Sequence, residues 1–223
     1  MRVKIEFIDA SNPNPEVIRR AANLIIKGKV IVCPTDTCYI FAANGLDPKA
    51  VAGVFQLKGR AYSNPIHVVV HSLEAAEKYA YLNEAARHLA RRFLPGALTL
   101  VFPKKEIIPS LLVARRDTVG IRIPDNRVIL ALAAMTNLPL TATSANISGR
   151  ATPYTVQEVL GQLGNLMGQV ALALDQGPLL PIGTSTVVDL SVSPPRILRH
   201  GRISEQEILK ALYLAQGSAK EDK

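Results

Sequence analysis

The sequence predicts an α/β or α+β fold arranged as one domain. Segments with strand-like and helix-like patterns alternate along the whole chain, which is typical of a sheet covered by helices. Hydrophobic residues make up 48% of the 223 residues, which is enough for one substantial core. No repeat, low-complexity stretch or change of composition marks a linker. We therefore expect a single domain over residues 1–216, followed by a polar, flexible tail over residues 217–223.

The strands are expected where short apolar or alternating runs are bounded by turn residues. Residues 3–8 alternate between apolar and polar side chains and form the first such run. The apolar run at 30–32 is broken by Pro34, which cannot donate a hydrogen bond to a neighbouring strand. In chain order, strands are expected at 3–8, 30–32, 66–70, 98–102, 119–123, 140–143, 170–174, 186–190 and 195–199.

Capping residues mark the starts of the expected helices. Pro15 follows Asn14, and proline is favoured at the first position of a helix. Ser204 and Glu207 have the spacing of a capping box, in which each residue bonds to the backbone of the other. Helices are expected to begin at Asn14, Asp47, Ser72, Asn83, Asp125, Thr155 and Ser204, with the last one ending near Ala215.

The chain is basic, with a formal net charge of +8. Such a charge attracts nucleotides, RNA or acidic lipids without selecting among them. The sequence contains no run of about 18 apolar residues that would predict a membrane span. The first residues also lack the apolar segment of a secretory signal. We therefore expect a cytoplasmic protein that does not enter membranes.

Metal sites and disulfides are not expected. Cys33 and Cys38 lack the CxxC spacing of a zinc site, and we interpret both as core residues. His67 and His71 are four residues apart on an expected strand, which separates them by about 13 Å. Zinc binds its histidine ligands at about 2.1 Å, so this pair cannot share one ion.

The common nucleotide-binding and hydrolase motifs are absent, since the sequence contains no GxxxxGK[ST], GxGxxG, HExxH or GxSxG. Polar clusters instead stand beside expected strand ends, where α/β proteins place their sites. Lys58 and Arg60 can converge on one phosphate chain, the lysine as a point charge and the arginine as a fork. Each cluster alone is equally typical of a solvated helix end or a turn. The clusters are 34–37, 58–60, 118–122 and 143–149.

Arg122 stands inside the apolar run 119–124. An arginine in such a position is seldom fully buried without a partner. The partner is either an internal carboxylate or the anion of a ligand, and we favour the ligand.

Several stretches taken together resemble the YrdC-like family. They begin with CPTDTCY at Cys33 and end with ILRHGRI at Ile203, so they cover most of the chain. Between them lie KGRAYSNPIHVVV, FLPGALTLVF, TVGIRIPD, PLTATSANISG and GTSTVVDL. The resemblance implies a single-domain, twisted and mostly parallel sheet flanked by helices, with a large positively charged groove.

The resemblance also implies an activity, that of an L-threonylcarbamoyladenylate synthase, a nucleotidyltransferase. Such an enzyme makes threonylcarbamoyl-AMP and pyrophosphate from L-threonine, bicarbonate or CO2, and ATP. This is the first step of threonylcarbamoyladenosine (t6A) modification of tRNA. Mg²⁺ is expected to accompany ATP as substrate, and no tightly bound cofactor is expected. A downstream threonylcarbamoyl transferase complex would consume the product.

Site residues are carried over from the family by position. A polar tetrad of catalytic residues around the phosphates is expected to comprise Lys58, Arg60, Ser144 and Asn146. The ATP contacts are expected to be Lys58, Arg60, Tyr62, Thr118, Ser144, Thr152 and Arg199. The threonine pocket is expected to be formed by Thr35, His67, Arg122, Ala142 and Ser185, with Arg122 holding the carboxylate.

The implied reaction needs no protein nucleophile. The threonine amine attacks the CO2 equivalent, and an oxygen of the resulting carbamate attacks the α-phosphate. The protein must position two anions and neutralise the leaving pyrophosphate, which Lys58 and Arg60 can do. Ser144 as a nucleophile with Lys58 as its base is the less favoured alternative.

Two other functions stay open. The run Tyr39-Ile40-Phe41-Ala42 departs from the family's usual Tyr-Gly-Leu-Gly, which keeps a carbamoyl-transfer relative with another acceptor in play. The net charge of +8 is compatible with an RNA-binding or ribosome-maturation protein, and tRNA or other RNA is a possible partner of the synthase as well. Aromatic residues are only 5% of the chain, which disfavours base stacking as the main binding mode.

Overall fold

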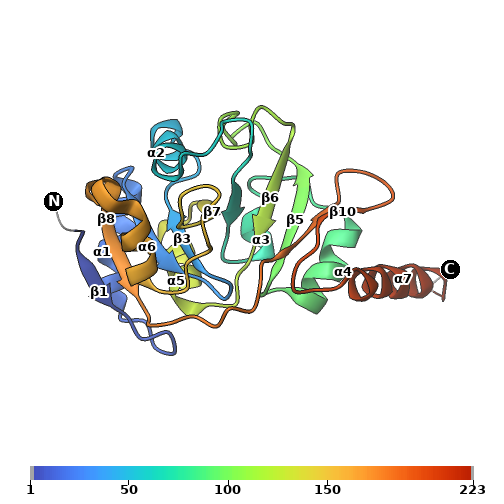
Figure 1. The fold of residues 1–223 in the computed structure, drawn as a ribbon. Helices are drawn as coiled ribbons and strands as arrows, with labels where there is room; N and C mark the ends of the chain where they lie inside the picture. The colour runs from blue at the N-terminus through green and yellow to red at the C-terminus, as the bar shows by residue number, and fades with distance from the viewer. Residues whose placement is uncertain (1–2, 222–223) are drawn as a thin grey trace.

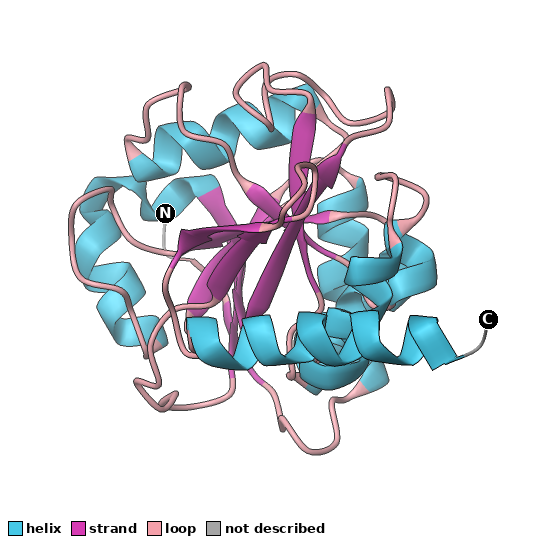
Figure 2. Ribbon diagram, turned by 90° about the vertical axis from the view of Figure 1, so that its right-hand side faces the viewer, coloured by secondary structure: helices cyan, strands magenta, loops and turns pink. Residues whose placement is uncertain are grey.

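The computed structural model describes residues 3–221. Within this range ten strands form one twisted sheet with helices on both faces (Figures 1 and 2), which confirms the predicted α/β class. The strands are β1 Ile5–Phe7, β2 Val30–Pro34, β3 Tyr39–Ala42, β4 His67–Val69, β5 Leu98–Pro103, β6 Thr118–Arg122, β7 Leu140–Ser144, β8 Val170–Asp175, β9 Thr186–Asp189 and β10 Arg196–Arg199. The helices are α1 Pro15–Ile26, α2 Pro48–Lys58, α3 Leu73–Ala76, α4 Glu84–Phe93, α5 Arg127–Thr136, α6 Val156–Leu163, the 3₁₀ helix η1 Gly164–Gln169, and α7 Glu205–Glu221.

The sheet is mixed, which corrects the expectation of a mostly parallel one. The strand order is β1-β8-β2-β3-β7-β4-β6-β5-β9-β10. Parallel pairing joins β1 to β8, β8 to β2, β4 to β6 and β5 to β9, whereas the other neighbours are antiparallel. Only four residues connect β2 to β3, and so short a connection permits antiparallel pairing but no crossover.

The central strand β3 is absent from the sequence prediction. It pairs with β2 on one side and with β7 on the other, and all four of its residues are buried. None of them takes a positive φ, so the segment needs no glycine. The departure from Tyr-Gly-Leu-Gly is therefore accommodated as a regular, apolar strand in the middle of the sheet.

Two hydrophobic layers enclose the sheet, and alternating residues of β2 show the division. Val30 and Val32 pack in the larger layer, with α2 and α6. Ile31 and Cys33 point to the opposite face and pack against α1 and α5. Beyond α1 and α5, this second face carries polar side chains.

Most helices begin where the capping residues predicted. The exception is α5, whose cap is Asn126 rather than Asp125, because the Asn126 Oδ1 accepts hydrogen bonds from the Val128 and Ile129 amides. The capping box of α7 is confirmed, since Ser204 N donates to Glu207 Oε2. The side-chain caps found as predicted are Asn14, Asp47, Ser72, Asn83 and Thr155.

The last helix is longer than predicted. We expect it to end near Ala215, but α7 continues to Glu221 and extends beyond the body of the fold beside α4 (Figure 1). A glycine inside a helix costs only about 1 kcal/mol relative to alanine, so Gly217 does not have to end it. Residues 222–223 lie outside the described residues. Of the described helices, none is both long and apolar enough to cross a membrane.

Candidate functional site

A polar cavity of about 180 Å³ lies on the uncovered part of the second face of the sheet. Its floor consists of alternate residues of neighbouring strands, which share one face because side chains alternate along a strand. In the order of the strands across the sheet, the floor residues are Ile40, Ser144, Ala142, His67, Val69, Arg122 and Thr99.

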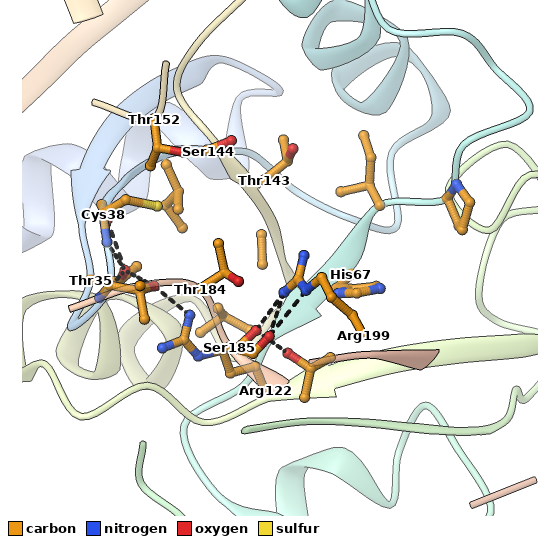
Figure 3. A pocket seen from close by; sticks show the side chains of 18 of the residues that line it. Thr35, Cys38, His67, Arg122, Thr143, Ser144, Thr152, Thr184, Ser185 and Arg199 are labelled. Carbon is orange, nitrogen blue, oxygen red and sulfur yellow. Dashed lines mark hydrogen bonds between the residues drawn. The ribbon is translucent and has the colours of Figure 1, made fainter. Parts of the chain in front are cut away.

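The ends of strands and the loops beside them form the sides of this cavity. Figure 3 shows Thr143, Ser144 and Thr152 on one side and Arg122 and Ser185 on the other. Residues from four further segments close it, namely Thr35, Thr37 and Cys38, then Arg60 and Pro65, then Gly183, Thr184 and Ser185, and finally Arg199.

Most of the expected site residues line this one cavity. Lys58 and Asn146 adjoin it through hydrogen bonds within the cluster that contains Ser144. The Tyr62 side chain does not line it, because this residue is 53% exposed and faces a different cavity, beside Phe55. Thr118 does not line it either, since β6 places it about 13 Å along the strand from Arg122. The expected residues that line the cavity are Thr35, Arg60, His67, Arg122, Ala142, Ser144, Thr152, Ser185 and Arg199.

Lys58 is the last residue of α2, and its side chain is buried against the end of β7. Gly59 follows in the left-handed conformation with φ +57° and ends the helix, as glycine does most readily. The Lys58 ammonium donates to the Ser144 carbonyl, to the Asn146 carbonyl at 2.9 Å and to Asn146 Oδ1 at 2.8 Å. All three ammonium hydrogens therefore have protein acceptors.

The hydroxyl of Ser144 donates to Asn146 Oδ1 at 2.6 Å. Lys58 contacts the carbonyl of Ser144 rather than this hydroxyl, so the arrangement is not that of a serine activated by a lysine base. Burial, and then the neighbouring charge of Arg60, lower the pKa of Lys58 to about 8.

Arg60 and Arg199 bring positive charge to the cavity without an acidic partner. Arg60 donates to the carbonyls of Asn64 and Pro65, which holds the loop after α2. Arg199 donates to the carbonyl and the hydroxyl of Ser185. Within residues 3–213, where the side chains are described, neither guanidinium has a carboxylate within ion-pair distance. Both charges are therefore available to an anionic ligand.

Arg122 differs from these two arginines because it is 7% exposed and already neutralised. Its Nη2 donates to Asp36 Oδ1 at 2.6 Å, and its Nη1 donates to Thr37 Oγ1 at 2.7 Å. Its Nε donates to the Gly96 carbonyl at 3.1 Å. The internal carboxylate thus supplies the partner, which corrects our preference for a ligand anion as the group that satisfies Arg122.

His67 lies between the arginines. Burial lowers the pKa of His67 to about 4, and the positive charges of Arg199, Arg60 and Arg122 add to this effect. The imidazole is therefore neutral near pH 7, with one N–H donor and one acceptor. Its ring packs on Gly120, where an added Cβ would lie 2.6 Å from Cδ2. Only glycine at position 120 leaves room for the ring in this place.

Some lining residues are missing from the sequence prediction. Thr37 and Thr143 belong to the polar clusters 34–37 and 143–149, so the sequence does contain a signal for them. Thr99 stands in an apolar strand and carries no local signal. Burial raises the pKa of the Cys38 thiol, so this lining residue is held as a thiol rather than a thiolate. Among the described residues, no group of three or more histidine, cysteine, aspartate or glutamate side chains could hold a metal ion.

The fold and the cavity define an α/β protein with a polar cavity on one face of its sheet, lined by Arg60, Arg122 and Arg199. The chain belongs to the Sua5/YciO/YrdC family, because the model of that family, described as "Telomere recombination", matches residues 23–201.

A threonylcarbamoyl-AMP synthase of Pyrococcus abyssi is 39% identical over 196 residues, which cover 87% of this chain and 57% of that protein. The threonylcarbamoyl-AMP synthase of Bacillus subtilis is 34% identical over 213 residues, which cover 93% of this chain and 61% of that protein. The chain thus spans only about three-fifths of the length of these two relatives.

Solved structures show the same fold. The crystal structure of P. abyssi Sua5 complexed with L-threonine has a TM-score of 0.87 and 37% identity, and the match covers 93% of this chain and 60% of that one. Escherichia coli YciO has a TM-score of 0.83 at 24% identity, over 92% of this chain and 99% of that one. The second likeness concerns the fold alone.

Proposed function

We propose that this chain is a threonylcarbamoyl-AMP synthase. Its substrates are L-threonine, either bicarbonate or CO2, and the magnesium complex of ATP. Its products are threonylcarbamoyl-AMP and pyrophosphate, so the enzyme is a nucleotidyltransferase. The observation that carries the proposal is that Thr35, Arg60, His67, Arg122 and Ser185, from five separate segments, line one cavity. The relatives of the same name, and the Sua5 structure that contains L-threonine, support the choice of substrate.

The proposed reaction uses the protein to position and neutralise its reactants. The neutral amine of threonine attacks the carbon of CO2, loses a proton and forms a carbamate. A carbamate oxygen then attacks the α-phosphorus of ATP, and the bond between that phosphorus and the bridging oxygen to the β-phosphate breaks. Pyrophosphate leaves with Mg²⁺. Arg60 and Arg199 lack acidic partners within residues 3–213 and are suited to stabilise the charge that develops on the phosphates.

The threonine side chain fits the floor of the cavity in chemical terms. Val69 and Ala142 offer apolar surface for its methyl group. The neutral imidazole of His67 offers either a donor or an acceptor to its hydroxyl. A cavity of about 180 Å³ at this place suits an amino acid, whereas the larger nucleotide extends towards Lys58 and Ser144.

Pyrophosphate release from magnesium and ATP, with and without threonine and bicarbonate, tests the proposal. Release that requires both additions is expected. Release that proceeds with another amino acid but not with threonine would favour a carbamoyl-transfer relative with a different acceptor. No release under any combination, together with measurable RNA binding by the folded protein, would favour the RNA-binding function.

We further propose that the product passes to a threonylcarbamoyl transferase that acts on tRNA, and that the chain works in the cytoplasm. Threonylcarbamoyl-AMP is a mixed anhydride that water hydrolyses, so a nearby acceptor enzyme limits its loss. The basic net charge of +8 is compatible with tRNA lying close to this chain.

A further inference from the structure

Thr99 is a buried residue on the cavity floor, and its hydroxyl contacts Ser185. It lies on β5 directly opposite Arg122 of β6, and it is 1% exposed. Its neighbours Leu98 and Leu100 point to the other face and fill the larger hydrophobic layer. The only partner of the Thr99 hydroxyl within the described residues is Ser185 Oγ, at 2.9 Å.

We propose that Thr99 is a positioning residue that holds Arg199 in place through Ser185. This inference rests on the proposed function, in which Arg199 contacts ATP. The chain of contacts is short, because Arg199 Nη2 donates to Ser185 Oγ at 2.8 Å and that oxygen shares a hydrogen with Thr99. Figure 3 shows Ser185 and Arg199 side by side at the edge of the cavity.

Arg199 needs such a support because it comes from an edge strand. The register of β10 against β9 shifts between Ile197 and Arg199, and a bulge of this kind redirects the side chain that follows it. All hydrogen bonds of the guanidinium within the described residues go to Ser185. The position of Ser185 therefore decides where the positive charge lies.

The segment after β10 is pressed against Ser185 as well. A Cβ at Gly201 would lie 2.5 Å from the carbonyl carbon of Ser185 and from the Thr184 oxygen, so only glycine permits this approach. The backbone of Ser185 is thereby fixed. Its hydroxyl can still rotate, and apart from Arg199 itself, Thr99 is the one side chain among the described residues that bonds to it.

Thr99 is a suitable anchor for that hydroxyl. Its strand pairs with β6 on one side and with β9 on the other, so its backbone is held on both edges. Threonine is branched at Cβ, which restricts the rotation of its side chain in a strand. A valine would fill the same space without the hydrogen bond. The hydroxyl is therefore the feature that distinguishes threonine at this position.

The hydroxyl hydrogens of Thr99 and Ser185 indicate what kind of ligand group this edge of the cavity can bind. Each hydroxyl has one hydrogen and two acceptor sites. Thr99 and Ser185 share one hydrogen between them, so their second hydrogen has no acceptor among the described residues and is free for a ligand in the cavity that Thr99 and Ser185 both line. Together with the N–H groups of Arg199, this hydrogen gives the edge of the cavity a set of hydrogen-bond donors that suits an oxyanion such as a phosphate or carboxylate group.

The experiment compares Thr99→Val with Thr99→Ser in pyrophosphate release at varied ATP. Thr99→Val is expected to lower kcat/KM for ATP by roughly 2- to 10-fold, the scale for a lost hydrogen bond between two neutral groups. Thr99→Ser keeps the hydroxyl and should restore most of the rate. In an Arg199→Ala background, Thr99→Val should have little further effect, because residues that act through one another are not additive. Full additivity would overturn the inference.

Thr141→Val is the matched control. Thr141 is another buried threonine whose hydroxyl is hydrogen-bonded, but its bonds go to the backbone of Ala43 and Phe41. The Thr141→Val substitution should lower the stability of the fold without changing KM for ATP. If Thr141→Val changes KM as much as Thr99→Val does, then Thr99 acts only through stability and the inference fails.

Calorimetric titration with a non-hydrolysable magnesium–ATP analogue distinguishes a failure of this inference from a failure of the proposed function. The wild-type chain should bind the analogue, and Thr99→Val should bind it more weakly. If the wild type and Thr99→Val bind it equally well, only the positioning role of Thr99 is overturned. If the wild type does not bind it at all, the proposed function itself fails.

Discussion

The guanidinium of Arg122 is held by the carboxylate of Asp36, with 2.6 Å between Nη2 and Oδ1. The side chains of both residues are largely buried, at 9% and 13% exposure. The pair ties the middle of the sheet, at β6, to the loop between β2 and β3. It therefore sets the position of Thr37 and its neighbours, which form one wall of the cavity.

Removing the carboxylate with Asp36→Ala should destabilise the fold. It leaves a buried guanidinium without its counter-charge, and breaking such a pair costs about 3 kcal/mol or more. Urea unfolding measures the loss. The control is Glu16→Ala, which breaks the exposed pair with Arg19 and should cost less than about 1 kcal/mol. Equal losses in the two variants would show that the Asp36 pair contributes no more than a surface contact.

Arg122→Ala should weaken the use of threonine more than the use of ATP. The substitution removes the Arg122 guanidinium from the floor. It leaves the carboxylate of Asp36, which stands between the lining residues Thr35 and Thr37, without its counter-charge, so that this carboxylate repels the carboxylate of an amino acid. We expect KM for threonine to rise by roughly 10-fold or more, the effect of losing a charged hydrogen bond. Steady-state kinetics with each substrate varied in turn provides the measurement. An unchanged KM for threonine would rule out contact between Arg122 and its carboxylate.

Lys58→Ala and Ser144→Ala should each abolish pyrophosphate release while the protein stays folded. Lys58 holds the carbonyls of Ser144 and Asn146, and Ser144 in turn orients the Asn146 side chain. The cluster therefore acts as one unit beside the phosphates, and loss of either member disturbs it. Circular dichroism confirms folding and a coupled assay follows pyrophosphate. Near-normal turnover in either variant would contradict the role of the cluster.

The rate should fall as the pH rises through about 8, because burial lowers the pKa of Lys58 from its usual 10.5 to about 8 and deprotonation removes its positive charge. In Lys58→Arg the charge persists, so whatever activity remains should lack this alkaline limb. Stability changes in the opposite direction. Between pH 8 and 10.5 the unfolded chain binds more protons at this position than the folded chain, so stability rises with pH across that window. A wild-type profile that is flat from pH 7 to 9 would contradict the proposal.

Gly120→Ala should displace the His67 ring, because the added Cβ would lie 2.6 Å from Cδ2. We expect a higher KM for threonine and a shift of the His67 imidazole resonances in NMR spectra. The control is Gly161→Ala in α6, where an added Cβ meets no atom within 4 Å. That change should stabilise the helix by up to about 1 kcal/mol and leave the kinetics unchanged. An unshifted His67 signal in Gly120→Ala would contradict the close packing.

Local signals in the sequence predicted the helices and most of the strands. The caps Asn14, Asp47 and Thr155 work through contacts within four residues, so a short window of sequence contains all the information they need. The strand β3 was missed because its four apolar residues follow a turn without alternation. The mixed direction of the sheet also escaped prediction, since strand order depends on which distant segments pair.

In the candidate site, too, some residues could be predicted from the sequence, whereas some contacts are visible only in the tertiary structure. The polar clusters and their resemblance to the YrdC-like family, read from the sequence alone, indicated Lys58, Arg60 and Ser144, and these residues lie at the cavity. Only the tertiary structure paired Asp36 with Arg122 across 86 positions and placed Thr99 beside Ser185. The physical reason is that a charge or a hydroxyl acquires its role from the groups that packing brings within about 3 Å of it. Nothing in the neighbouring sequence of Thr99 or Asp36 records those groups.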